Sequence, residues 1–262
     1  MARLVLSVCI YFLLTFYLSA QQTVTSSPPA QTFLQNSLAA LAGGQTLTDV
    51  TLTGTARRIA GSDDESGTVV IKTLVGAGSR IDLTLPSGTR REIRNTSSAL
   101  VAGSWSGPDN VPHAMAYHNL LTDPGWAPAF TIASLLSARN AVITYVGSET
   151  RDAQSVIHII VCRQFPTISV DPGALPQHLT QTDLFLDATT FLLAAVAFNT
   201  HPDTNAGLDI PVEIIYGDYR QVSGAQLPFH IQKKLNGSLS LDLQFSTATL
   251  NSGLSASALG IQ

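Results

Sequence analysis

The six histidines are the side chains whose spacing can be tested most directly for metal binding or acid–base chemistry. His113 and His118 lie five residues apart in a segment predicted to be helical, which puts their rings about 140° apart around the helix axis. Two metal ligands on one helix need i, i+4 spacing instead. His158 lies in an apolar strand, where a hydrogen-bonded core histidine is the commoner finding, and His201 and His230 belong to no recognisable motif. The histidines therefore predict neither a metal site nor a general base.

Oxygen-bearing side chains alternate in the pattern D-x-N-x-G-x-D, formed by Asp203, Asn205, Gly207 and Asp209. Carboxylate and amide oxygens at alternate positions can surround a calcium ion, but this pattern lacks the glutamate that closes a complete calcium loop. A tight turn needs the same residue types. We favour the turn and keep calcium binding as the alternative.

Serines lie between glycines at Gly103-Ser104-Trp105-Ser106-Gly107, but without the G-x-S-x-G spacing of a nucleophile elbow. A nucleophile also needs a base and a group that orients the base, and the sequence shows no such set. We therefore predict no catalytic residue, no metal, no cofactor and a non-enzymatic protein. A hydrolase with a non-standard site, in which a histidine, a carboxylate and a hydroxyl converge, stays an open alternative.

The composition excludes several classes of protein. Of the 262 residues, 45% are hydrophobic and 12% are charged, and the net charge is −4. An intrinsically disordered chain would have low hydrophobicity and high charge. A nucleic-acid-binding protein would carry a clustered basic face, so we predict no nucleic-acid partner.

The first twenty residues have the pattern of a signal peptide. Arg3 precedes an apolar run that ends at Ser19-Ala20, and a polar, proline-rich stretch follows. We predict cleavage after Ala20, a flexible lead-in at 21–30, and export to the periplasm or the medium of a bacterial cell. The alternative is an uncleaved N-terminal anchor. No later run is long enough for a transmembrane segment.

The remaining residues, 31–262, are predicted to form one mainly β (α+β) domain. Apolar residues at helical spacing predict a short amphipathic helix over 31–42, and two further helices are expected at 112–121 and 128–138. Elsewhere apolar and polar residues alternate, which predicts antiparallel strands with one buried face. Asn236-Gly237 is the strongest hairpin signal. About ten or eleven strands are expected in a single curved antiparallel sheet.

Three C-terminal segments, LFLDATTFLLAAVAF, IIYGDYRQVSGAQLPFHIQKKLNG and LNSGLSASALGI, carry a family resemblance. The sequence resembles the outer-membrane lipoprotein-sorting (LolA-like) proteins over roughly residues 183–260, particularly their uncharacterised exported relatives. The matching residues are Tyr216, Asp218, Tyr219, Arg220, Gly224, Pro228, Phe229, Asn251, Gly253 and Leu254.

The resemblance implies a half-open β-barrel with helices over its mouth, in which family members bind acyl chains of lipoproteins or other hydrophobic molecules. Carriers of this family use an arginine near the groove, for which Arg57 and Arg58 are the candidates. Residues 107–137 and 199–209 are longer than a minimal carrier needs. The resemblance therefore supports the fold more strongly than the carrier role.

The leading hypothesis is an exported protein that binds a lipid or a lipoprotein acyl chain in the mouth of a half-barrel. The alternative is a structural or interaction protein of the cell envelope that uses the same fold without a small-molecule ligand. The sequence does not specify the oligomeric state. For each candidate lining residue taken singly, plain core packing is the commoner role; these residues are Phe33, Leu38, Val50, Leu52, Val69, Ile71, Ile81, Leu83 and Leu85.

Overall fold

The computed structural model describes residues 27–97, 101–164 and 174–261. The predicted signal peptide and its cleavage point lie outside the described residues. Everything below refers to the three described ranges.

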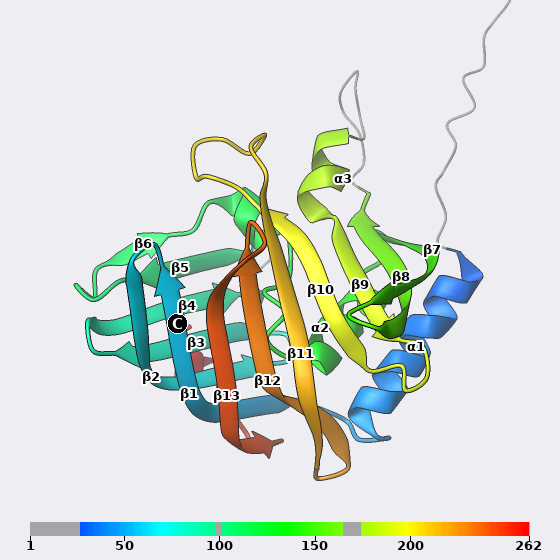
Figure 1. Cartoon of the computed structure of the whole chain (residues 1–262), viewed down its shortest axis with the longest axis horizontal. Helices are drawn as coiled ribbons and strands as arrows, with labels where there is room; N and C mark the ends of the chain where they lie inside the picture. Colours follow the sequence, from blue (N-terminus) through cyan, green and yellow to red (C-terminus); the bar gives the residue numbers. More distant parts are fainter. Residues whose placement is uncertain (1–26, 98–100, 165–173, 262) are drawn as a thin grey trace, which may run out of the picture.

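Thirteen strands form one antiparallel sheet that remains open (Figure 1). The strands are β1 Asp49–Ala60, β2 Asp63–Leu74, β3 Gly78–Leu85, β4 Gly88–Asn95, β5 Ala102–Ser106, β6 Pro112–Ala114, β7 Ala141–Arg151, β8 Gln154–Arg163, β9 Thr182–Asp187, β10 Leu193–Thr200, β11 Ile210–Val222, β12 Ala225–Leu235 and β13 Ser238–Leu250. Their order is β6-β5-β4-β3-β2-β1-β13-β12-β11-β10-β9-β8-β7. The first strand therefore pairs with the last in the middle of the sheet, and β6 and β7 are its two edges.

The mainly β fold class and the antiparallel sheet are confirmed, but the expected ten or eleven strands were too few. The strands that sequence analysis missed are β5 and β6. Residues 112–121, predicted as a helix, contain β6 and then a 3-10 helix, η1, Tyr117–Leu120. The backbone around His113 pairs with Trp105 on β5, and the two rings stack with centroids 4.4 Å apart. This cross-strand pair outweighs the weak local helical pattern.

Three α-helices accompany the sheet: α1 Pro28–Ala42, α2 Pro128–Ser137 and α3 Ala174–Thr180. The first two confirm the helices predicted at 31–42 and 128–138. α1 begins earlier than predicted, at Pro28, so residues 28–30 of the expected flexible lead-in are helical, and Ala30 is buried. α1 ends at Gly43, which adopts φ +58° and donates its backbone N–H to the Ala39 carbonyl. A Cβ at Gly43 would lie 1.8 Å from the Gly224 carbonyl oxygen, so the close approach of helix and hairpin requires glycine here. No helix in the described ranges is both long and apolar enough to cross a membrane.

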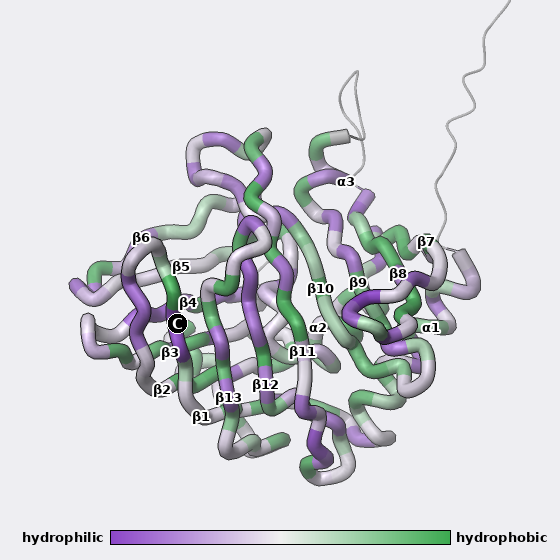
Figure 2. Tube along the Cα trace, viewed as in Figure 1, coloured by the Kyte–Doolittle hydropathy of each residue, from purple (hydrophilic) through white to green (hydrophobic). Residues whose placement is uncertain are grey.

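The main hydrophobic core lies on the concave face of the sheet, beneath α1 and α2. α1 contacts α2, β12 and β7. The alternation that predicted the strands is visible along β1, β12 and β13 as changing hydropathy (Figure 2). Side chains of both helices and of most strands meet there without exposure to solvent, among them Leu34, Leu41, Ile71, Ile132, Ile159, Leu184, Ile214, Ile231 and Leu243.

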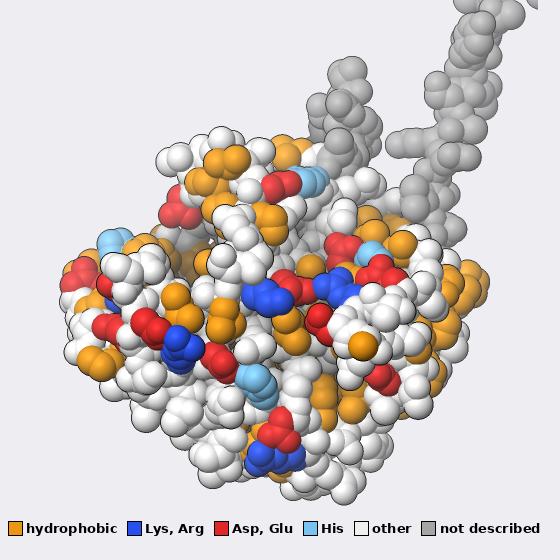
Figure 3. Space-filling model, in the orientation of Figure 1, with side chains coloured by type: hydrophobic (Ala, Val, Ile, Leu, Met, Phe, Trp, Pro, Cys, Tyr) orange, Lys and Arg blue, Asp and Glu red, His pale blue; other side chains and the backbone are white. Residues whose placement is uncertain are grey.

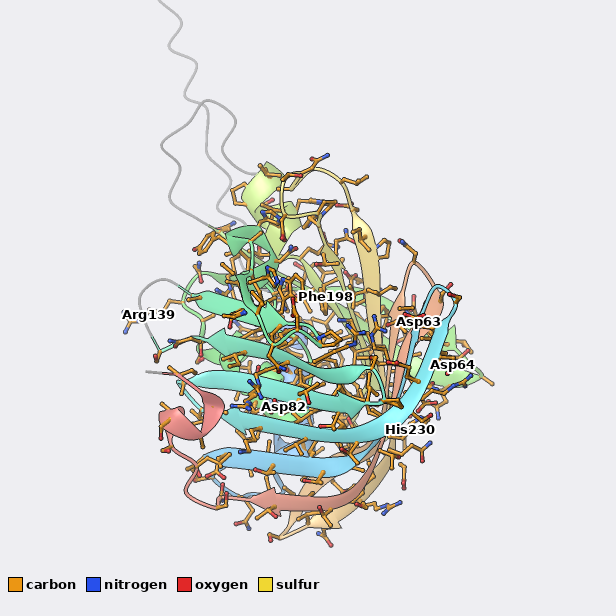
Figure 4. All side chains as sticks on the ribbon, turned by 90° about the vertical axis from the view of Figure 1, so that its left-hand side faces the viewer. Asp63, Asp64, Asp82, Arg139, Phe198 and His230 are labelled. Atoms are coloured by element: carbon orange, nitrogen blue, oxygen red, sulfur yellow. The ribbon has the colours of Figure 1, made fainter. Side chains whose placement is uncertain are left out.

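The convex face carries charged side chains in pairs (Figure 3). Arg57 donates to Asp64 over 2.8 and 2.6 Å, and His230 lies 2.7 Å from Asp242. Figure 4 looks toward strands β2–β5 and labels Asp64, at the start of β2, and Asp82, on β3. Asp82 accepts hydrogen bonds from both Arg80 and Arg91, each at 2.6 Å. Arg57, Arg80, Arg91 and His230 therefore each have a carboxylate partner on the outer face of the sheet.

The start of β1 is hydrogen-bonded to the segment after β13. The Asp49 carboxylate accepts bonds from the Ser252 amide (2.8 Å), the Ser252 hydroxyl (2.7 Å) and the Gly253 amide (3.0 Å). Burial acts to raise the pKa of Asp49, but these hydrogen bonds outweigh it and hold the pKa below its usual value. Asn251 accepts from the Thr48 amide at 2.8 Å. The Asn251 and Gly253 positions of the family-like ending therefore fix the segment after the last strand to the start of the first strand, in the middle of the sheet.

Candidate binding pocket

The concave side of the sheet is hollow at one end. A pocket of about 510 Å³ lies between a wall formed by β3, β4 and β5 and a facing wall formed by β12 and β13. This volume is within the range of small-molecule sites. Its apolar lining comes from Ile81 and Leu83 on β3, and from Leu235 and Leu241 on the facing strands.

Both tryptophans of the chain line this pocket. Trp105 stands at the rim and is 44% exposed, whereas Trp126 is 3% exposed. The loop before Trp126 is fixed by a hydrogen bond of 2.6 Å from the Tyr216 hydroxyl to the Gly125 carbonyl. Gly125 has φ +74°, and a Cβ there would lie 2.9 Å from that hydroxyl. Tyr216 belongs to the family-like hairpin, so this motif positions a pocket residue.

Strand β4 brings charged side chains into the apolar interior. Its register with β3 places Glu92 opposite Ile81 and Arg90 opposite Leu83. Directly opposite residues project from the same face of a sheet, so Arg90, Glu92 and Arg94 face inward. Ile93 therefore faces outward, where it packs against a small cluster with Leu259 of the 3-10 helix η2, Ala256–Leu259.

Arg94 and Glu92 form a pair inside the molecule. Arg94 Nε donates to Glu92 Oε1 at 2.7 Å, and Arg94 Nη1 donates to the carbonyls of Asn119 (3.1 Å) and Thr122 (2.9 Å). Burial acts to raise the pKa of Glu92, but the charges of Arg94 and Lys233 and the Arg94 hydrogen bond lower it overall. Glu92 is therefore ionised, and its charge is already compensated.

Lys233 projects from β12 toward the same interior. Its Nζ lies 5.7 Å from the centre of the Trp126 ring, within cation–π range. Burial lowers the pKa of Lys233, with the nearby Glu92 charge opposing and the Arg94 charge adding to that effect. The ion pairs of the described residues do not include Lys233, so its ammonium group has no direct counter-ion there.

Two arginines of the pocket have buried nitrogens without an acceptor. Arg58 Nη1 and Arg90 Nε make no hydrogen bond within the described part of the chain. Arg90 Nη2 reaches only the Ser87 hydroxyl, at 3.4 Å. Arg57, the neighbour of Arg58, lies on the opposite face of β1 in its ion pair with Asp64. Of the two candidate groove arginines, the pocket therefore contains Arg58 and not Arg57.

The structure brings only two of the nine predicted lining residues to this pocket, Ile81 and Leu83. Phe33 and Leu38 on α1 are half-buried and pack against the main core. The other five predicted lining residues are buried in the main core; they are Val50, Leu52, Val69, Ile71 and Leu85. Contact of these five with a ligand stays a prediction.

Sequence reasoning missed the charged members of the pocket. Arg58 and Lys233 continue the inward-facing periodicity of β1 and β12, so their positions carried a signal. Arg90 and Glu92 could not be found in this way, because strand 89–95 has a single apolar residue and it faces outward.

A cluster of possible metal ligands lies elsewhere. The ligand atoms of His178, His201 and Asp209 lie within 4.8 Å of one another. Asp209 Oδ1 is 2.8 Å from His178 Nε2 and 3.4 Å from His201 Nδ1, which are contacts that histidine–carboxylate pairs make without a metal. Asn205 accepts from the Gly207 amide at 3.1 Å, as in the turn favoured from the sequence.

The acid–base groups that line the pocket are Glu92, which accepts a hydrogen bond from Arg94, and Lys233. The lining includes neither histidine nor cysteine. His158 and His230 pair with Asp183 and Asp242, each at 2.7 Å, and alternation along their strands directs both toward the convex face.

No protein-family model matches the sequence, and no curated protein matches it closely enough to count as a relative. Solved structures do match. A domain assigned to outer-membrane lipoprotein sorting, from Vibrio parahaemolyticus, is 13% identical over 88% of this chain and 97% of that chain, with a TM-score of 0.55. A LolA superfamily protein from Nitrosomonas europaea is 12% identical over 88% of this chain and 96% of that chain, with a TM-score of 0.55.

A DUF1329 family protein from Desulfovibrio piger is 9% identical over 90% of this chain and 100% of that chain, with a TM-score of 0.58. Identities this low establish shared architecture and leave the ligand open. The architecture expected from the C-terminal motifs is confirmed: the chain has the LolA-like fold of the outer-membrane lipoprotein-sorting proteins.

Proposed function

We propose that this is an exported, non-enzymatic protein of the bacterial envelope that binds a hydrophobic ligand, the acyl chain of a lipid or lipoprotein, in the pocket at the hollow end of the sheet. The observation that carries the proposal is the pocket of about 510 Å³ between Leu83 on one wall and Leu241 on the other, with Trp126 beside them. Burying an acyl chain there stabilises the complex by about 0.8 kcal/mol for each CH₂ group removed from water.

The two tryptophans make the binding test direct, because both line the pocket. Titration of the delipidated protein with a brominated fatty acid should quench tryptophan emission in a saturable way, with micromolar affinity. Native mass spectrometry of the untreated protein should show a co-purified lipid. A protein that binds none of the acyl chains offered would overturn the proposal and favour the inert envelope platform.

A variant pair assigns any binding to the pocket. Leu83→Asp places a charge on the pocket wall, and an unpaired charge in an apolar setting costs several kcal/mol, so quenching should disappear. Thr84→Asp places the same charge on the exposed opposite face of β3 and should bind as the wild type does. Circular dichroism confirms that both variants are folded. Equal binding by the two variants would remove the pocket from the proposal.

Export is tested separately. Intact-mass measurement on envelope fractions should show a chain that begins at Gln21. A full-length species that is released only by detergent would contradict the predicted cleavage after Ala20.

A further inference from the structure

We propose that the natural ligand of the pocket is an anionic amphiphile, with a carboxylate or phosphate head held by Arg58 and Arg90 and an acyl chain lying against the apolar lining. This inference rests on the proposed function and specifies which hydrophobic ligand the pocket selects. It is drawn from the balance of charge inside the pocket.

The charged side chains that face the pocket are mostly cationic. Arg58, Arg90, Arg91 and Lys233 line it together with one carboxylate, Glu92, and the side chain of Arg91 is already paired with Asp82 on the outer face. Glu92 already accepts the hydrogen bond of Arg94, which also faces inward. The whole chain, by contrast, has a net charge of −4. The pocket therefore carries an excess of positive charge, although the protein as a whole is acidic.

Arg58 and Arg90 lack the partners that the arginines on the outer face have. Arg57, Arg80 and Arg91 each lie 2.6 Å from a carboxylate oxygen on the outer face. Arg58 and Arg90 appear in no ion pair of the described residues, and each has a buried nitrogen without an acceptor. A buried donor without an acceptor is destabilising, so an acceptor that enters with a ligand stabilises the complex at this point.

The chemistry of these groups selects the head. Guanidinium groups bind carboxylates and phosphates through paired, charge-assisted hydrogen bonds, and a low-dielectric pocket strengthens them. The ammonium group of Lys233, which also lines the pocket, gains from the same negative charge.

The rest of the lining selects the tail. Ile81, Leu83 and Leu241 offer nothing to a free inorganic anion, and the volume of about 510 Å³ exceeds what one needs. An amphiphile satisfies both parts of the pocket at once.

The test compares ligands that differ only in the head. Hexadecanoate, hexadecyl phosphate, hexadecanol and inorganic phosphate are titrated against the purified protein, with brominated fatty acid displacement read through tryptophan emission. We expect both anionic amphiphiles to bind roughly ten- to a hundredfold more tightly than the alcohol, since hydrogen bonds to charged groups are worth that difference. Inorganic phosphate should not displace the probe. The relative affinities of the first two distinguish a fatty acid from a phospholipid as the source of the head.

Variants locate the preference. Arg58→Met with Arg90→Met should abolish the discrimination between acid and alcohol, because the affinity for the acid should fall to that for the alcohol. Arg57→Met is the matched control, one residue away on the outer face, and should keep the discrimination in full. Circular dichroism and retained binding of the alcohol show that the double variant is folded.

The outcomes separate this inference from the proposed function. Equal wild-type affinity for acid and alcohol would overturn the anionic head and leave the hydrophobic carrier in place. Absence of binding by every amphiphile would overturn both. Displacement by inorganic phosphate alone would reassign the pocket as a simple anion site, and discrimination that survives in the double variant would exclude these arginines.

Discussion

Two positions on one strand pair show how the interior changes from solid to hollow. On β12 and β13, Ile231 lies opposite Leu243, and both side chains are 0% exposed in the core beneath α1 and α2. Two residues further along, Lys233 lies opposite Leu241, and this pair lines the pocket. The strands and their alternation are the same at both positions. The difference lies in what faces them: helices at one end, and the separated β3–β5 wall at the other.

The comparison shows that alternation directs a side chain inward without determining what it will meet there. At the solid end, an inward residue gains dispersion contacts on all sides. At the hollow end, an inward residue makes dispersion contacts on some sides only, and the rest of its surface is left for contact with a ligand. Mutations that distinguish the two ends test this directly, and the changes below run from the largest expected effect on stability to the smallest.

Arg94→Met should have the largest effect, because the hollow end depends on one buried charge pair. Without Arg94, ionised Glu92 loses its direct partner inside an apolar recess, and removing one member of a buried pair costs about 3–5 kcal/mol of unfolding free energy. Urea denaturation measures the loss. Arg91→Met, which removes an outer-face pair with Asp82, should cost about 1 kcal/mol or less. Equal losses for the two variants would contradict the role given to the inner pair.

Leu243→Ala tests the solid end. Its side chain is 0% exposed, so truncation leaves a cavity among helices and strands that cannot close around it. We expect a loss of about 2–5 kcal/mol in the free energy of unfolding, with unchanged quenching by a brominated fatty acid.

Leu241→Ala makes the same substitution two residues away, in the pocket. Because this side chain already borders empty space, the loss of stability should stay below about 1.5 kcal/mol. Affinity for the acyl chain should fall instead. If Leu241→Ala destabilised the protein as much as Leu243→Ala does, the two ends would be equally packed and the distinction would be wrong.

The change of stability with pH should be smaller than the effects of these substitutions. Two carboxylates, one at the start of β1 and one in the pocket, should contribute to it. Two carboxyl groups have a lowered pKa in the folded protein: Asp49, which accepts hydrogen bonds from Ser252, and Glu92, which lines the pocket. A lowered pKa in the folded state means that the unfolded chain binds protons more readily. These groups therefore contribute their full stabilisation above their unfolded pKa values of about 4. That stabilisation is lost as the pH falls through their pKa values in the folded protein. Unfolding midpoints measured between neutral pH and about pH 3 should therefore decline on the acid side. Asp49→Asn should flatten that decline, and an acid limb unchanged by the substitution would exclude Asp49 as a contributor.

Much of the fold could be predicted from the sequence because its strands alternate strictly. Residues 238–250 show this alternation. The hairpin turn predicted at Asn236-Gly237 is also present, and both of its residues have positive φ. Strand β5, AGSWS, was missed because it has no alternating apolar side chains and forms through pairing with β4. Local pattern cannot report a strand that its neighbour specifies.

The candidate pocket was less predictable than the fold. In the strand at 89–95, the only apolar residue is Ile93, and burying apolar residues would suggest that it faces the interior. The register with β3 and the cover provided by η2 reverse this orientation, and they direct Arg90 and Glu92 inward. Both determinants lie outside the strand itself, so no reading of residues 89–95 alone could have revealed the charges.

The pairing of the first strand with the last also has a consequence for the time course of folding. The hydrogen bond between Thr48 and Asn251 joins residues 203 positions apart, and β1 takes β13 as its second neighbour in the middle of the sheet. At a synthesis rate of about 5–20 residues per second, roughly 10–40 s pass between the synthesis of β1 and that of β13. Contacts so distant in sequence also form slowly once the chain is complete, because a long loop must close first. Through that interval one edge of β1 has unpaired backbone groups, and at that edge the nascent chain is open to pairing with strands other than its own.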